Sequence, residues 1–327
     1  MVKSLNTELT DRELKAARKA AKRERKERNR RNSVKPVREL KSYSNKKKKL
    51  AFCFSGQLRT WNSSIGTWQI LFDELKEKHN VSVIDVFCHI WDHNTVQQGI
   101  KHATESEVIT TSVPDDEITR YIEQLKPVSY KIDDIIASKK AMKDTQFQTV
   151  IDSNAVSRGK YNAWLSPQFY SVMYAAHLKR RYEIENDFHY DACVRMRNDL
   201  FLNDRFRECL PIETFLNPEF NTMYSCHSGI DESVWFRKRL GDVFWYADSP
   251  TFDKLSNFYH WFPNMPLEMT ISHDAPPEHL LYYYTRMCNI SIDPNIVHYV
   301  SVCRDADYAK KKEAAGLGPL GEHEVQC

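Results

Sequence analysis

The chain alternates short apolar runs with longer amphipathic stretches through most of its length. Apolar runs typical of strands cover residues 50–54, 81–91, 127–133, 192–196, 221–226, 242–248 and 290–302. Stretches with helical periodicity cover residues 68–78, 114–125, 166–183, 250–261 and 276–287. This alternation predicts an α/β domain, in which helices flank an open sheet.

Two of these helices begin with recognisable start signals. Ser112 is a candidate N-cap for the helix at 114–125, because a serine hydroxyl can accept a bond from a free amide of the first turn. Ser166 followed by Pro167 gives the same signal for the helix at 166–183, with proline in the first turn. We expect residues 136–158, which are polar and irregular, to form a loop.

Polar residues follow the first two strands. Ser55, Gly56, Gln57 and Arg59 come directly after the first apolar run, and we expect a tight Ser-Gly turn there. Gly56 would let the backbone approach a ligand closely, and the three polar side chains could bond to it. Asp92 ends the second strand in the same way. The full glycine-rich dinucleotide fingerprint and the Walker loop are both absent from the sequence.

The run Tyr190–Phe201 is the segment with the most chemical potential. Its apolar residues predict a buried strand, and Arg195, Arg197 and Asp199 gather at the carboxyl end. Ligands of open α/β sheets bind at this end of the strands. Two guanidiniums beside one carboxylate suit a phosphate, with the carboxylate available for a metal ion or a hydroxyl. The structural alternative is an arginine–aspartate ion pair at a strand end.

Gln168 lies near the start of the predicted helix at 166–183 and could face a ligand. The apolar stripe on the same helix is more typical of core packing than of a cofactor site.

Charge is distributed very unevenly along the 327 residues. Residues 1–50 hold 19 Lys or Arg and 6 Asp or Glu, a net charge of +13, whereas the other 277 residues hold 28 and 38, a net charge of −10. Residues 11–31 favour a helix but have almost no large apolar side chain, so they cannot pack on a core. We expect residues 1–46 to form a basic arm, helical or disordered, in which residues 11–49 could contact a polyanion. A solubilising tail is the alternative.

Cysteine spacing and hydropathy bound the cellular context. The eight cysteines are scattered and no Cys-x-x-Cys pair occurs, which favours buried, reduced thiols over a zinc site or a disulfide framework. No apolar leader and no membrane-length apolar run is present in the sequence. We therefore expect a cytoplasmic protein, attached to a membrane at most peripherally. Residues 47–304 should form the folded domain and residues 305–327 a polar tail.

Several of these motifs, taken together, resemble those of a known protein family. The motifs are Ser55-Gly-Gln-Leu-Arg-Thr60, Phe87-Cys-His-Ile-Trp-Asp92, Gln168-Phe-Tyr-Ser171, Tyr190–Leu200, Tyr246-Ala-Asp-Ser249 and Pro277-Glu-His-Leu-Leu281. In order and spacing they look like glycosyltransferases of bacterial polysaccharide clusters and large phages, including the WavE-like lipopolysaccharide synthesis proteins. The resemblance covers residues 48–300 and excludes the basic arm. For a phage-encoded protein, it implies a location in the host cytoplasm.

The resemblance implies a GT-A arrangement, a single Rossmann-like domain that binds a nucleotide-diphospho-sugar. It also implies an Asp-x-Asp motif that holds a divalent cation, Mn²⁺ or Mg²⁺, against the diphosphate. This chain has Arg197-Asn-Asp199 at that place, so Asp199 is the metal candidate and an arginine replaces the first acid. The donor site would comprise Ser55, Gly56, Gln57, Arg59, Asp92, Gln168, Arg195, Arg197 and Asp199.

The chemistry of sugar transfer assigns two further roles. Negative charge develops on the leaving nucleoside diphosphate, and a metal ion or a guanidinium can stabilise it. An inverting enzyme also needs a base for the acceptor hydroxyl, and the candidates are Asp231 and Glu278. The acceptor could be a surface glycan or a modified DNA base. Two alternatives are a nucleotidyl- or phosphotransferase on a similar sheet, and a non-catalytic nucleic-acid-binding phage protein.

Overall fold

The computed structural model describes residues 47–98, 107–138, 162–225, 240–261, 277–293 and 300–302. The fold belongs to the compact unit Lys47–Cys327. Its centre is a seven-stranded sheet in the order β10-β8-β9-β6-β1-β2-β5. The strands are β1 (Lys48–Gln57), β2 (Val81–Trp91), β5 (Ser129–Asp133), β6 (Ala192–Arg197), β8 (Thr222–Ser225), β9 (Phe244–Ala247) and β10 (Ser291–Asp293).

Every neighbouring pair in this sheet is parallel except the two pairs that involve β9, which runs antiparallel to both β6 and β8. The carboxyl ends of β1, β2, β5 and β6 therefore meet at one edge. The α/β class predicted from the sequence, a sheet flanked by helices, is confirmed.

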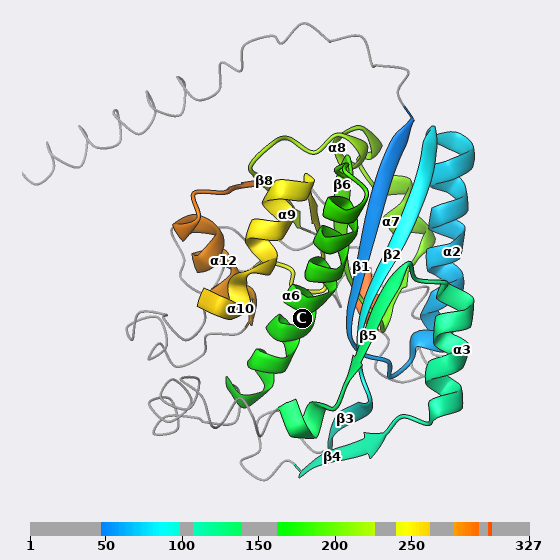
Figure 1. Cartoon of the computed structure of the whole chain (residues 1–327), viewed down its shortest axis with the longest axis vertical. Coiled ribbons are helices and arrows are strands. Elements are labelled where there is room, and N and C mark those ends of the chain that lie inside the picture. Colours follow the sequence, from blue (N-terminus) through cyan, green and yellow to red (C-terminus); the bar gives the residue numbers. More distant parts are fainter. Residues whose placement is uncertain are drawn as a thin grey trace, which may run out of the picture. The chain divides into compact units, whose positions relative to one another are not determined.

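Helices cover both faces of the sheet (Figure 1). One layer contains α2 (Trp61–Lys78), α3 (Asp115–Leu125), α7 (Asp204–Cys209) and α8 (Ile212–Leu216). The other contains α6 (Asn162–Glu185), α9 (Ser249–Ser256), α10 (Phe258–Trp261) and α12 (Pro277–Met287).

The central strands contribute side chains to both layers. Leu50, Phe52 and Phe54 of β1 join the core cluster on the α2 side, whereas Ala51 and Cys53 join the cluster on the α6 side. This follows from the two-residue period of a strand. Because both faces are buried, the strand is almost continuously apolar, which is why the sequence predicted it.

The predicted Ser-Gly turn after β1 is wrong. The strand continues through Gln57, and Ser55 and Gly56 still pair with His89 and Ile90 of β2. Gly56 has a φ of +118°, a conformation that disfavours any residue with a Cβ, so this position within the strand favours glycine. The chain turns afterwards, where Arg59 takes a left-handed φ of 42°.

Both predicted helix caps are also wrong. Ser112 is the last residue of a strand, β4 (Glu107–Ser112), and pairs with His93 of β3 (His93–Gln98), so Pro114 takes the N-cap position of α3. Helix α6 begins at Asn162 instead of after Ser166, which puts Pro167 inside the helix. The β3–β4 hairpin itself was not predicted, because its strands are polar and lack alternation.

Two predicted segments are divided in the structure. The helix expected at 250–261 is α9 followed by the short α10, with Asn257 between them. The run at 290–302 yields β10 and a separate strand, β11 (Val300–Val302), which pairs antiparallel with β7 (Leu200–Leu202). The basic arm at 1–46, most of the loop expected at 136–158 and the tail at 305–327 lie outside the described residues.

Buried thiols are confirmed at three positions, Cys53, Cys88 and Cys193. Burial raises the pKa of all three thiols, that of Cys193 to about 12, so they stay protonated and unreactive. Among the helices of the described residues, none is both long and apolar enough to cross a bilayer.

Candidate functional site at the strand ends

Four of the predicted site residues come together where β1 and β6 end. We call Gln57, Arg59, Arg197 and Asp199 the arginine–carboxylate cluster. Arg197 donates two parallel bonds to Asp199, from Nε to Oδ1 at 2.9 Å and from the terminal nitrogen to Oδ2 at 2.7 Å. Arg59 donates to the same Oδ2 at 3.3 Å and to Gln57 Oε1 at 2.9 Å. The ion pair weighed from the sequence therefore forms, with a second arginine added.

The carboxylate of the cluster is buried, whereas its two arginine side chains are partly exposed. The Asp199 side chain is 1% exposed, whereas those of Arg59 and Arg197 are 27% and 19% exposed. Burial by itself would raise the pKa of Asp199, but the charges and bonds of the two guanidiniums outweigh it and hold the pKa below its ordinary value. With two positive groups and one negative group, the cluster keeps one net positive charge at the sheet edge.

Side-chain hydrogen bonds between segments distant in sequence hold this cluster in place. The Asn198 side chain donates to the Gly56 carbonyl at 2.9 Å and accepts from the Tyr121 hydroxyl at 2.8 Å, joining β6, β1 and α3. The Arg59 amide donates to Asn94 Oδ1 at 2.9 Å, which fixes the turn after β1. The Gly56 carbonyl is therefore bonded to a side chain of the protein itself.

Asp199 in this arrangement does not fit a divalent cation. Both of its oxygens accept N–H groups from guanidiniums, and the two positive charges beside it oppose a third. Carboxylates that bind Mg²⁺ or Mn²⁺ must instead offer free oxygens to the ion. Asp199 serves as the anchor that orients Arg59 and Arg197.

Arg195 and Ser55 lie deeper on the α6 side of the sheet. Alternation puts Arg195 on the same face as Arg197, as expected. Its side chain is only 1% exposed, however, and one terminal nitrogen donates to the Val243 carbonyl at 3.2 Å, joining β6 to the segment before β9. Ser55 pairs with Arg197 across the strands and is also buried. Arg59 and Arg197, in contrast, have side chains that are partly exposed, 27% and 19%.

Asp92 belongs to a second group of side chains, at the end of β2. One oxygen of Asp92 accepts from His93 Nδ1 at 2.7 Å and from the Ile135 amide at 3.2 Å. Asp134 lies beside them, and one ligand atom from each of Asp92, His93 and Asp134 lies within 4.8 Å of the others. This trio could hold a cation, although one Asp134 oxygen already accepts two amide hydrogen bonds at the start of a helical turn.

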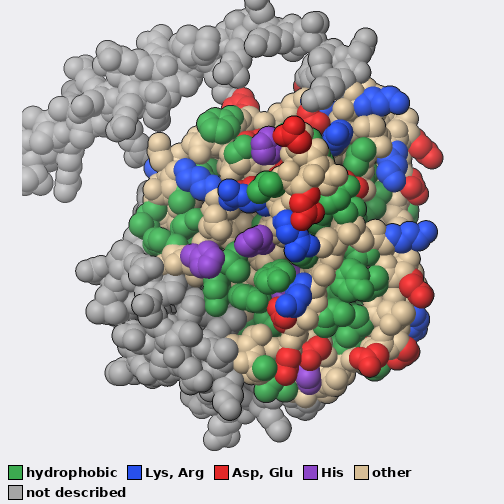
Figure 2. Space-filling view, in the orientation of Figure 1, with side chains coloured by type: hydrophobic (Ala, Val, Ile, Leu, Met, Phe, Trp, Pro, Cys, Tyr) green, Lys and Arg blue, Asp and Glu red, His purple; other side chains and the backbone are tan. Residues whose placement is uncertain are grey.

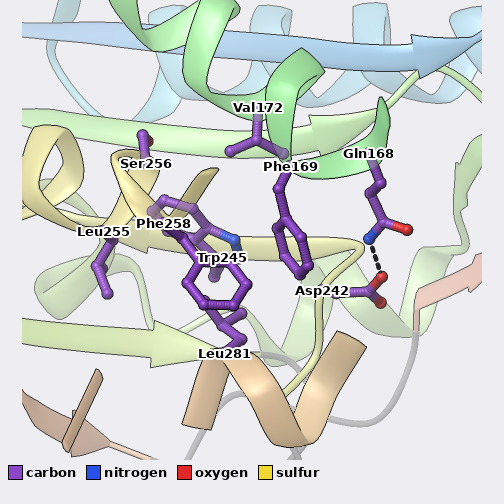
Figure 3. Close-up of a pocket in the computed structure, with 9 residues that line it drawn as sticks. All are labelled: Gln168, Phe169, Val172, Asp242, Trp245, Leu255, Ser256, Phe258 and Leu281. Carbon is purple, nitrogen blue, oxygen red and sulfur yellow. Dashed lines mark hydrogen bonds between the residues drawn. The ribbon is translucent and has the colours of Figure 1, made fainter. Parts of the chain in front are cut away.

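Gln168 lines a small, mostly apolar pocket between α6, β9, α9, α10 and α12 (Figure 3). Its amide donates to Asp242 Oδ2, at the polar end of the pocket. The lining residues are Gln168, Phe169, Val172, Asp242, Trp245, Leu255, Ser256, Phe258 and Leu281. The Gln168 side chain therefore bonds to the segment that precedes β9.

Of the two predicted bases, Glu278 lies in the first turn of α12, where its backbone carbonyl accepts from the Leu240 amide at 3.2 Å. Asp231 lies outside the described residues.

Sequence reasoning missed a histidine network at the ends of β2 and β5, formed by His89, Lys131, Asp133, Tyr170 and Ser171. His89 Nδ1 is 2.8 Å from the Ser171 hydroxyl and Nε2 is 3.0 Å from Asp133 Oδ2. Lys131 and Tyr170 also bond to the Asp133 carboxylate, at 3.1 and 3.3 Å. Asp133 follows a predicted strand just as Asp92 does, and that signal could have found it.

The network holds the Asp133 carboxylate in position. It does not act as a serine nucleophile with a histidine base. His89 and Ser171 are both fully buried, so no substrate reaches the serine hydroxyl. Burial lowers the pKa of His89, so the ring is neutral, and because Asp133 can only accept, Nε2 carries the hydrogen. The His89 bond is the main cause that lowers the pKa of Asp133, which stays ionised at the sheet edge.

Comparisons with known proteins give likenesses to solved structures and no sequence match. No family model matches the chain. No curated protein matches it by sequence. Among solved structures, the apo form of mouse xyloside xylosyltransferase 1 matches with 7% identity and a TM-score of 0.36, over 76% of this chain and 84% of that one.

Proposed function

We propose that the protein is a glycosyltransferase that moves a sugar from a nucleotide-diphospho-sugar to a hydroxyl acceptor. The observation that carries the proposal is the pair Arg59 and Arg197, held by a buried Asp199 at the carboxyl ends of β1 and β6. Open α/β sheets bind ligands at this edge. The motif resemblance, with its GT-A arrangement, supports the same assignment.

The two guanidiniums suit the leaving group of this reaction. Breaking the bond between sugar and phosphate leaves a nucleoside diphosphate, on which negative charge develops in the transition state. Guanidinium forks match phosphate oxygens, and both arginines are partly exposed. Because Asp199 fixes both side chains beforehand, little reorganisation is needed when the charge appears.

A divalent cation is the other means of neutralising a diphosphate, and the resemblance implies one. Within the described residues, Asp92, His93 and Asp134 would hold it better than Asp199, since they offer two carboxylates and an imidazole without a guanidinium bonded to them. Such an ion would stabilise charge on the leaving diphosphate. The arginines carry our proposal, with the cation as a supplementary charge.

The acceptor side keeps the two bases named from the sequence, Asp231 and Glu278. Asp133 is less suited to the role, because the bond from His89 lowers its pKa and weakens it as a base. A surface glycan and a modified DNA base both remain acceptors of the proposed kind, and the cytoplasm remains the proposed location.

A transfer assay with a panel of labelled sugar nucleotides tests the proposal, with nucleoside triphosphates in parallel arms. Each donor is offered with Mn²⁺ and with a chelator, against hydroxyl acceptors that include water. We expect sugar transfer or donor hydrolysis that falls roughly 100-fold or more in Arg59→Gln and Arg197→Gln. The matched control is Arg181→Gln, because Arg181 is an exposed surface partner of Glu185.

Turnover of nucleoside triphosphates without turnover of any sugar nucleotide would instead identify a nucleotidyl- or phosphotransferase. Full activity in both arginine variants would contradict the role given to the cluster.

A further inference from the structure

Strand β5 exposes apolar side chains at the edge of the central sheet. Of the eight large hydrophobic side chains that are exposed in the described part of the chain, four lie within nine residues: Val128 (41%), Tyr130 (48%), Ile132 (38%) and Ile136 (54%). The face drawn in Figure 2 carries apolar side chains in the area over β5. An exposed apolar edge strand is usually blunted or covered, because it can pair with another strand.

The backbone of β5 is also available for pairing. The strand is last in the order of the sheet, and among the described strands it pairs only with β2. The Val128 amide donates to the Val86 carbonyl at 2.8 Å, so the backbone groups of Val128 face β2. Because these groups alternate along a strand, those of Ser129 and Lys131 face away from β2.

We propose that β5 of one copy of this chain pairs antiparallel with β5 of a second copy, around a two-fold axis at Tyr130. This register puts Val128 opposite Ile132 on the face that carries the exposed apolar side chains. It also makes Ser129 and Lys131 a hydrogen-bonded pair, in which each amide donates to the carbonyl of the other residue. One register thus pairs the backbone groups that face away from β2 and also packs the apolar side chains against one another.

Charge favours a second copy over an unrelated strand. Lys126 precedes β5 and Asp134 follows it, and both side chains are exposed. In the proposed register the two strands run in opposite directions, so Lys126 of each copy approaches Asp134 of the other. A two-fold interface of this kind is self-complementary, as closed dimers require. The strand has five residues, so we expect a reversible dimer.

Sedimentation of the full chain over a concentration series tests the proposal. We expect a monomer–dimer equilibrium, and we expect Tyr130→Lys to shift it to monomer by placing two like charges opposite each other on the axis. Ile70→Lys is the matched control, because Ile70 is exposed to a similar extent (46%) but lies on α2. Melting temperature and circular dichroism check that both variants remain folded.

Oxidative cross-linking tests the register itself. In the proposed pairing residue 130 faces its own counterpart, at a distance that suits a disulfide, whereas residue 128 lies about 14 Å from its counterpart. Tyr130→Cys should therefore cross-link under mild oxidation, and Val128→Cys should cross-link no more than the unaltered chain. A monomer at every concentration, or a dimer that Tyr130→Lys leaves unchanged and Tyr130→Cys does not link, would overturn the proposal. A complex with another protein through β5, without self-association, would overturn it equally.

Discussion

Asp199 is a buried carboxylate that holds two arginine side chains at one edge of the sheet. It accepts three N–H groups from Arg59 and Arg197, and both guanidiniums stay partly open to solvent. The carboxylate therefore stabilises two cations that would otherwise repel each other. Its own charge is maintained by them, since they hold its pKa below the ordinary value.

Asp199→Asn should destabilise the fold by about 1–3 kcal/mol at neutral pH, because it leaves two guanidiniums with a neutral partner. The loss should depend on pH. Because the pKa of Asp199 is lower in the folded protein, its carboxylate contributes stability at pH values above the unfolded-state pKa of about 3.9. This contribution is lost as pH falls through the folded-state pKa. Urea unfolding from pH 7 to pH 3 should show the two proteins converging at the acid end. A constant difference would contradict the assignment of charge.

His89 predicts a pH dependence in a different range. Burial lowers its folded pKa, so its neutral form contributes stability above the unfolded pKa of about 6.5, and this stability is lost as pH falls toward the folded value. His89→Gln should remove that dependence while lowering stability at pH 7.5. The check is urea unfolding at closely spaced pH values below 7, compared with His177→Gln, which alters an exposed histidine. If unfolding free energy changed equally with pH in the unaltered protein and in both variants, His89 would be ruled out as the titrating group.

At the scale of single elements, the apolar strands and the longest helices could be predicted, whereas their ends could not. Strand β1 extends past its apolar run because Asn198 and the partners in β2 hold Ser55–Gln57 in the sheet. Ser112 was predicted as a cap because nothing local reveals the β3–β4 pairing that contains it. These boundaries depend on contacts between segments distant in sequence.

The positive φ of Gly56 gives a test at this scale. Gly56→Ala should cost roughly 1–3 kcal/mol, because its φ of +118° strains any residue with a Cβ although the added methyl meets no atom within 4 Å. Gly66→Ala is the matched control, since Gly66 lies inside α2 and its methyl also meets no atom within 4 Å. That change should stabilise the protein by about 0.5–1 kcal/mol. Thermal unfolding measures both, and equal effects would refute the conformational explanation.

At the scale of the whole molecule, the sequence predicted which strand ends would meet, and it offered the arginine–aspartate ion pair as one alternative, but it did not predict the other bonds at this edge. The hydrophobic runs were sufficient to bring Arg59, Arg197 and Asp199 to one edge. The histidine network could not be predicted in the same way, because His89 and Ser171 are 82 positions apart and nothing in either segment specifies the other. Contacts between side chains so far apart in sequence depend on how the strands and helices are arranged in the folded protein.

The basic arm gives a prediction that concerns the full chain. Residues 1–50 carry a net charge of +13 on a body of −10, so we expect any affinity for DNA or another polyanion to fall steeply as salt rises. Deleting residues 1–45 should remove most of that affinity and flatten its dependence on salt. Fluorescence anisotropy with a labelled duplex at several salt concentrations measures both, and unchanged binding without the arm would contradict the prediction.

Calorimetric titration with nucleoside diphosphates tests most directly the contact proposed between a diphosphate and the side chains of Arg59 and Arg197. The titrations are made in a chelator, so that the arginines alone supply the positive charge. We expect at least one nucleoside diphosphate to bind, and we expect Arg59→Gln and Arg197→Gln to weaken it about tenfold or more while Arg181→Gln does not. Binding to none of them, or equal affinity in all four proteins, would contradict the proposed site.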